Sequence, residues 1–111
     1  MKPGRRNLIA SFVVALLVGM SLPVTGQTVI VAIRDYKFEP ATIEVKVGQT
    51  VKWINGEKRT SHSIFFQGPS GFETERLFPG ESWERVFDKP GTYPYTCGPH
   101  PEMTGQVVVT E

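Results

Sequence analysis

Hydrophobic and polar positions alternate with a period of two from residue 27 onward, with no helical period. β-branched residues fill many of the alternating positions in three stretches: Val29–Ile33, Ile43–Val47 and Val51–Trp53. Five later stretches follow them: His62–Phe66, Phe72–Leu77, Glu81–Phe87, Gly91–Cys97 and Gly105–Thr110. Short segments rich in glycine, proline or asparagine separate the stretches. The pattern predicts an all-β fold, an eight-stranded Greek-key β-sandwich.

Two residues do not fit plain strands. Pro94 lies inside Gly91–Cys97 but has no N–H to donate, so we expect it to face away from the pairing or to mark a bulge. Arg85 shares the inward parity of its strand, and we expect its stem to pack while its charged head reaches water. Five aromatic residues at strand positions are expected in the core: Trp53, Trp83, Phe87, Tyr93 and Tyr95. Four acidic residues are expected on a solvated face: Glu73, Glu75, Glu81 and Glu84.

Residues 1–26 have the layout of a secretory signal peptide. Basic residues near the start precede Leu8–Met20, an uncharged and mostly apolar run of 13 residues, and small residues end at Gly26. We predict cleavage after Gly26, which leaves a domain of residues 27–111. An uncleaved anchor is the alternative, although the apolar run is shorter than the roughly 20 residues that span a bilayer. The adjacent arginines Arg5 and Arg6 leave both the general secretory and the twin-arginine export routes open.

The charge and the cysteine content exclude some classes of protein. Cleavage removes Lys2, Arg5 and Arg6, which changes the net charge from +1 to −2 and argues against a nucleic-acid partner. The single cysteine excludes an internal disulfide. A domain this small buries a thin core and is often stabilised by a metal.

The candidate chemistry lies in the segment Cys-Gly-Pro-His-Pro-Glu-Met, residues 97–103. Cys97, His100 and Met103 share one short loop between two predicted strands, and His62 opens an earlier strand. One thiolate, two imidazoles and a weak thioether form the blue-copper ligand set. A zinc half-site, a Cys–His nucleophilic pair and an ordinary buried Cys and Met are the alternatives. Zinc rarely uses Met, and a hydrolase needs an orienting group and a substrate cleft for which this domain has little room.

The chain resembles the cupredoxins, specifically the amicyanin, plastocyanin and pseudoazurin group. The similar segments are Phe38–Pro40, Ile43–Val45, Gly48–Trp53 and Pro90–Cys97, followed by a short Cys-x-Pro-His-Pro-x-Met loop that is most like that of amicyanin. The resemblance implies one type 1 copper ion held by His62, Cys97, His100 and Met103. It also implies a periplasmic carrier of single electrons, without enzymatic activity.

Two departures from the family pattern concern the surroundings of the site. The family often has an asparagine after the first ligand histidine, where its side chain bonds to the copper loop. This chain has Ser63 there, and a serine hydroxyl reaches less far than an asparagine amide. Amicyanin has an aromatic residue before the loop methionine, whereas this chain has Glu102.

The sequence is compatible with three functions. An electron shuttle would exchange electrons with redox proteins such as a c-type cytochrome or a periplasmic dehydrogenase, as a monomer without membrane contact after signal cleavage. A periplasmic copper chaperone or copper buffer would need exposed, exchangeable sites, and the single Met of the mature chain favours the shuttle. A zinc-binding or metal-free binding module is the third possibility.

Overall fold

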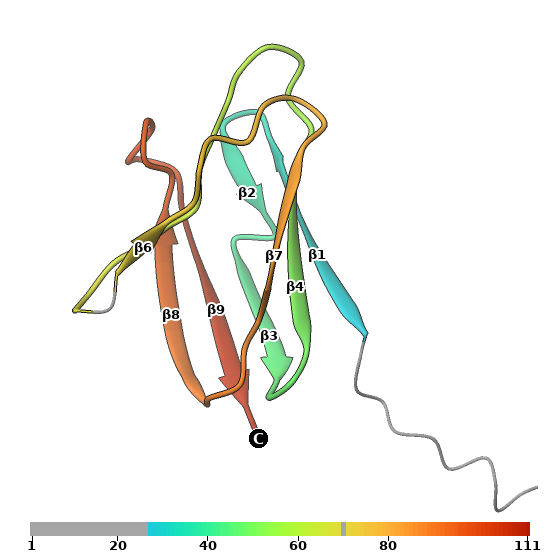
Figure 1. Ribbon diagram of the computed structural model, residues 1–111, viewed down its shortest axis with the longest axis vertical. Coiled ribbons are helices and arrows are strands. Elements are labelled where there is room, and N and C mark those ends of the chain that lie inside the picture. Colours follow the sequence, from blue (N-terminus) through green and yellow to red (C-terminus); the bar gives the residue numbers. More distant parts are fainter. Residues whose placement is uncertain (1–26, 70) are drawn as a thin grey trace, which may run out of the picture.

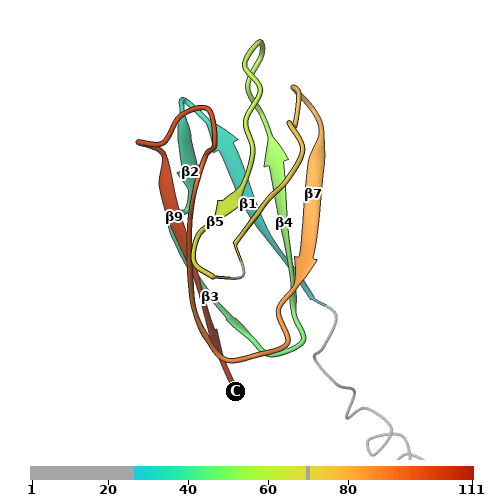
Figure 2. The ribbon, with the colours of Figure 1, turned by 60° about the vertical axis from the view of Figure 1, so that its left-hand side comes forward.

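Nine strands in two facing sheets make up the computed structural model, which describes residues 27–69 and 71–111 (Figures 1 and 2). The signal peptide expected at residues 1–26 lies outside the described residues. One sheet has the order β2-β1-β4-β7 and the other β3-β9-β8-β5-β6. The strands are β1 (Thr28–Arg34), β2 (Lys37–Glu39), β3 (Thr42–Lys46), β4 (Thr50–Asn55), β5 (Phe65–Phe66), β6 (Phe72–Glu73), β7 (Ser82–Val86), β8 (Gly91–Thr96) and β9 (Thr104–Thr110).

Both sheets are mixed, and the all-β sandwich expected from the sequence is confirmed. β1 runs parallel to β4 and β3 runs parallel to β9, while the other pairs are antiparallel. The structure adds β2, which the alternation pattern did not predict. It also shortens the stretch Phe72–Leu77 to a two-residue strand, and His62 contributes only an isolated bridge to Leu77.

The alternation along the strands places one face of each sheet in the core. In β4, Val51, Trp53 and Asn55 are fully buried, and the residues between them are half-buried. Trp53, Phe87 and Tyr95 lie in the core as expected, with Trp83 and Tyr93 partly buried against it. The Trp53 ring contacts Tyr95 edge-on, with ring centroids 5.5 Å apart, so aromatic contacts join the two sheets.

Arg85 is half-buried, and the structure adds aromatic contacts that the sequence did not indicate. Its guanidinium carbon lies 4.7 Å from the ring centroid of Phe66, 4.5 Å from that of Phe87 and 5.3 Å from that of Tyr93. The inward parity of β7 aims the side chain between the sheets, where the electron-rich ring faces attract the cation. Pro94 marks no bulge, because the pairing of β8 with β9 continues through it.

The connections that carry the candidate site meet at one end of the sandwich (Figures 1 and 2). The β1–β2 turn, the loop from β4 to β5 and the red loop between β8 and β9 lie at the top of both views, whereas the C-terminus lies at the opposite end. No helix among the described residues is long and apolar enough to cross a membrane.

Candidate metal centre

The loop between β8 and β9 is closed by three backbone hydrogen bonds. The Cys97 N–H donates to the Met103 carbonyl at 3.1 Å, the His100 N–H to the Cys97 carbonyl at 3.2 Å, and the Met103 N–H to the His100 carbonyl at 2.9 Å. These bonds fold seven residues into consecutive turns and bring the backbone of Cys97, His100 and Met103 together. Cys97 is fully buried, Met103 is buried and His100 is half-buried.

His62 reaches the same place from the connection between β4 and β5. Its N–H donates to the Leu77 carbonyl at 3.1 Å, and its carbonyl accepts the Leu77 N–H at 2.7 Å. The side chain is fully buried. The isolated bridge therefore fixes the backbone of His62 where the regular strand has not yet begun.

The donor atoms of His62, Cys97 and His100 face one another. The Cys97 Sγ lies 3.5 Å from Nδ1 of His62 and 3.6 Å from Nδ1 of His100. The three donor atoms lie within 4.8 Å of one another. Metal bonds of about 2.0 Å to nitrogen and about 2.3 Å to sulfur allow one ion to join atoms at these separations. The donor set therefore fits a thiolate- and imidazole-bound metal.

Glu57 holds the outer nitrogen of His62. Its Oε2 lies 3.1 Å from Nε2 of His62 and also accepts the Tyr36 N–H at 2.9 Å. A carboxylate only accepts hydrogen bonds, so Nε2 of His62 carries the proton and Nδ1 keeps a free lone pair. Glu57 thus selects the tautomer that can bind a metal on the side of Cys97.

Asn55 organises the loop that carries Glu57. This fully buried side chain donates through Nδ2 to the Thr60 carbonyl at 2.9 Å and to the Leu77 carbonyl at 2.8 Å. Its Oδ1 accepts the Glu57 N–H at 2.8 Å. The sequence did not indicate this role of Asn55, which the structure places at the centre of the polar network behind His62.

Burial sets the protonation state of the metal-free site. Burial raises the pKa of the Cys97 thiol, and the Ser63 N–H, which lies 3.4 Å from Sγ, only partly offsets this effect. Burial also lowers the pKa of His62, against the opposing effect of Glu57. The pKa of Glu57 is itself lowered: burial acts to raise it, but hydrogen bonds from the Tyr36 N–H and from His62 outweigh burial. A metal must therefore displace the thiol proton, so its affinity depends on pH.

Tyr36 is a neighbour of the site that the sequence did not indicate. Its ring centroid lies 4.9 Å from that of His100 and 5.6 Å from that of His62, with nearly perpendicular planes. Its hydroxyl lies 3.2 Å from Oγ1 of Thr60. Asp35 and Tyr36 have φ values of 52° and 57°, a left-handed conformation that is uncommon outside glycine. The exposed ring of Tyr36 therefore lies on the surface next to His100.

Glu73 is exposed, as the sequence predicts, but it also makes a contact that the sequence did not indicate. Its carboxylate accepts the Ser63 hydroxyl at 2.7 Å, and the same hydroxyl oxygen accepts the Gly98 N–H at 3.0 Å. Parity on a predicted strand could not reveal this contact, because Ser63 and Gly98 come from two other segments. The shorter side chain at position 63 still reaches the loop.

A cupredoxin-like domain model matches residues 7–109 of the chain. The chain belongs to the cupredoxin family. Amicyanin from Paracoccus denitrificans is 36% identical over 90 residues, which cover 78% of this chain and 68% of the relative. Pseudoazurin from Methylorubrum extorquens is 28% identical over 111 residues, which cover 94% of this chain and 74% of the relative.

Solved structures agree with this membership. A Cu(I) form of an amicyanin variant superposes with a TM-score of 0.71 at 34% identity, covering 78% of this chain and 85% of that chain. The resemblance read from the copper loop is thereby confirmed, and copper is the cofactor of this family, as the sequence predicts.

Proposed function

We propose that His62, Cys97, His100 and Met103 hold one copper ion as a type 1 site, and that the chain carries single electrons between redox proteins. The observation that carries the proposal is the position of the buried Cys97 Sγ, 3.5 Å and 3.6 Å from the inner nitrogens of the two histidines. The amicyanin and pseudoazurin relatives support electron transfer as the general role.

The residues around the site restrict movement and exclude water. Copper supplies a one-electron couple when bound. Cys97, His62 and Met103 are shielded from solvent, and the backbone bonds of residues 97–103 together with the Glu57–His62 contact keep the donors in place. Donors that move little give a small reorganisation cost for electron transfer. Half-buried His100 gives a partner protein its shortest approach to the site.

A copper chaperone or copper buffer is the second candidate. Such a protein must release its metal readily to another protein. Here two of the proposed ligands, His62 and Cys97, have no exposed surface, and Asn55 fixes the loop beside them. A closed site of this kind favours electron transfer over metal exchange.

We also propose that the protein works in the periplasm after cleavage behind Gly26, by either export route. A c-type cytochrome or a periplasmic dehydrogenase would be its partner class. Expression of the full chain in a Gram-negative host, followed by N-terminal sequencing of the periplasmic fraction, should give a protein that starts at Gln27. A product that retains residues 1–26 would support the membrane anchor instead.

Addition of Cu(II) to the metal-free protein tests the site. We expect an intense blue colour from charge transfer between sulfur and copper, and slow loss of the copper to a chelator. Cys97→Ser should abolish the colour and keep the circular dichroism of the sandwich, since one sulfur contributes little to the core. A pale complex, or prompt transfer of copper to the chelator, would favour the chaperone; an unchanged spectrum in Cys97→Ser would refute the ligand assignment.

A further inference from the structure

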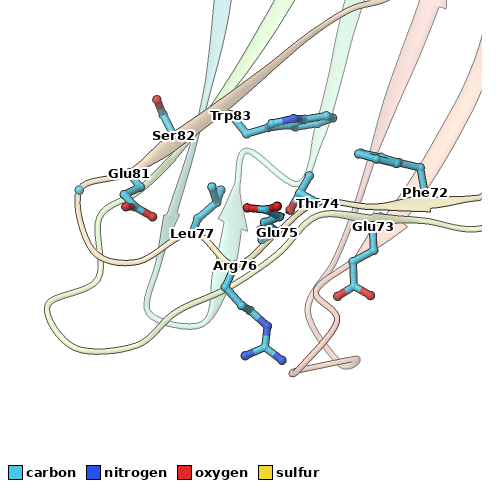
Figure 3. Close-up of a pocket in the computed structure, with 10 residues that line it drawn as sticks. Phe72, Glu73, Thr74, Glu75, Arg76, Leu77, Glu81, Ser82 and Trp83 are labelled. Carbon is cyan, nitrogen blue, oxygen red and sulfur yellow. Dashed lines mark hydrogen bonds between the residues drawn. The ribbon is translucent and has the colours of Figure 1, made fainter.

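Ser63 connects three separate segments next to Cys97. Its fully buried side chain bonds to Glu73 on β6 and to the backbone of Gly98 in the copper loop. Its own N–H donates to the Cys97 Sγ at 3.4 Å. In Figure 3 the carboxylate of Glu73 extends away from the groove between β6 and β7, toward the red loop of residues 97–103. One residue thus contacts the thiol, the loop that follows it and an acidic side chain on the sheet edge.

The directions of these hydrogen bonds follow from the groups involved. A serine hydroxyl has one proton, and an ionised carboxylate can only accept. Ser63 must therefore donate to Glu73, and its oxygen lone pairs face the Gly98 N–H. Without Glu73 the hydroxyl could rotate and use its proton elsewhere, so the carboxylate fixes the orientation in which Ser63 holds the loop.

Gly98 leaves the space that Glu73 occupies. A Cβ built on Gly98 would overlap Oε2 of Glu73, and it would lie 2.7 Å from Oγ of Ser63 and 2.9 Å from Cδ of Glu73. Gly98 is not among the glycines with positive φ, so the cost of a side chain there would come from space: the carboxylate of Glu73 would have to move, and Oγ of Ser63 is also close. Glu73, Ser63 and Gly98 therefore form one packed unit.

We propose that Glu73 is a positioning residue for the copper loop. Glu73 acts through Ser63. The Ser63 hydroxyl contacts the Gly98 N–H, and the Ser63 N–H contacts the Cys97 sulfur. The hydrogen bond from Ser63 N–H to the sulfur affects the electron density on the thiolate, so its alignment affects the reduction potential and the colour of the copper protein. This proposal rests on the proposed copper function for its spectroscopic consequences, but not for the hydrogen bonds of the metal-free loop.

Amide hydrogen exchange in the full metal-free protein tests the loop contact. Glu73→Ala should speed exchange of the Gly98 N–H by about tenfold, the order expected when one hydrogen bond is lost. Glu73→Gln keeps an acceptor and should restore most of the protection. Glu75→Ala is the matched control, because it removes the same charge from the same exposed segment and Glu75 makes no side-chain hydrogen bond among the described residues. Equal exchange in Glu73→Ala and Glu75→Ala would overturn the proposal.

The copper-loaded proteins provide a second measurement. Glu73→Ala should shift both the visible band and the midpoint potential, whereas Glu75→Ala should leave the band in place and change the potential only as any lost surface charge would. A colourless wild type would count against the proposed copper function, while the exchange result would still decide the role of Glu73. Identical bands in wild type and Glu73→Ala would contradict the effect on the sulfur.

Coupling between Glu73 and Gly98 gives a third test, by urea unfolding of the metal-free proteins. Gly98→Ala should lower the free energy of unfolding more in the wild-type background than in the Glu73→Ala background, because there the overlapping carboxylate is gone and only the contact with Oγ of Ser63 remains. Equal losses in the two backgrounds would show that Glu73 and Gly98 do not act together.

Discussion

His62 and His100 offer the same chemical group to the same site from opposite surroundings. His62 is fully buried, its outer nitrogen faces Glu57, and its backbone is bonded on both sides to Leu77. His100 is half-buried on a loop of seven residues, and its only side-chain hydrogen-bond neighbour among the described residues is Cys97. The first histidine is held by a polar network in the protein interior, and the second is held chiefly by its own loop. Of the two proposed ligands, His62 is therefore the rigid one and His100 the accessible one.

Replacing each histidine by glycine should give the largest difference between the two positions, in whether added imidazole restores the blue site. His100→Gly should recover a blue site when imidazole is added to the copper-loaded variant, because a half-buried position admits a small ligand from solvent. His62→Gly should not recover, because its position has no exposed surface. Visible absorption during an imidazole titration measures both. Equal recovery would show that the two positions do not differ in access.

Loss of the hydrogen bonds that Asn55 makes behind His62 should have the next largest effect, a decrease in the stability of the metal-free protein. Asn55→Ala removes three hydrogen bonds and leaves the Thr60 and Leu77 carbonyls without that donor. We expect the metal-free protein to lose about 2–4 kcal/mol of unfolding free energy, from buried polar groups left unpaired. Urea denaturation measures this loss. Gln67→Ala, at an exposed residue with one long hydrogen bond, is the control and should change stability by less than about 0.5 kcal/mol.

Acid should destabilise the metal-free protein through the same network. The pKa of His62 is lowered from 6.5 in the folded state by burial, so below that pH the unfolded chain binds the proton first and stability falls. The lowered pKa of Glu57 adds a second loss that begins below 4.5, since the folded state keeps its carboxylate ionised. Urea midpoints between pH 7 and pH 3 measure both effects. His62→Gln should flatten the upper part of the curve and Glu57→Gln the lower part; a wild-type curve that is flat from pH 7 to 5 would contradict the first assignment.

Substitution of Pro99, on the loop of His100, should have the smallest effect, a modest change in the midpoint potential. Proline has no N–H to donate to the neighbouring thiolate, and such a donor would stabilise negative charge on sulfur. Pro99→Ala should therefore raise the midpoint potential modestly, which voltammetry can measure. A fall in potential would mean that Pro99 acts through loop shape and not through its missing donor.

The sequence alone was sufficient to propose the metal loop, because the residues that indicate it lie close together in the chain. Cys97, His100 and Met103 lie within seven residues bounded by two strands, and His62 is the only other histidine. The neighbours of these ligands were missed because their contacts are long-range. Glu73 and Ser63 are ten residues apart and Glu57 and Tyr36 are twenty-one apart, and alternation within one strand carries no information about such pairs.

The fold shows the same division between local and distant information. β2 was missed because the chain reverses at Asp35 and Tyr36 without a glycine or proline to mark the turn. Arg85 was placed by the general preference of charged groups for water. Its position over three rings depends on Phe66 and Tyr93, which belong to the opposite sheet.

The turn at Asp35 and Tyr36 allows the surface beside His100 to change without a change in the metal-binding residues. Arg34 pairs with Lys37, so the hairpin loop has two residues, and positive φ at both is the conformation whose twist matches the strands. The pairing of β1 with β2, and not a contact with His100, therefore determines where the side chain at position 36 lies. A different side chain at position 36 would change the surface that a partner protein contacts, while His62, Cys97 and His100 would keep their positions. Recognition can therefore diverge between relatives without any change in the metal chemistry, at the cost of the backbone strain that a residue other than glycine bears there.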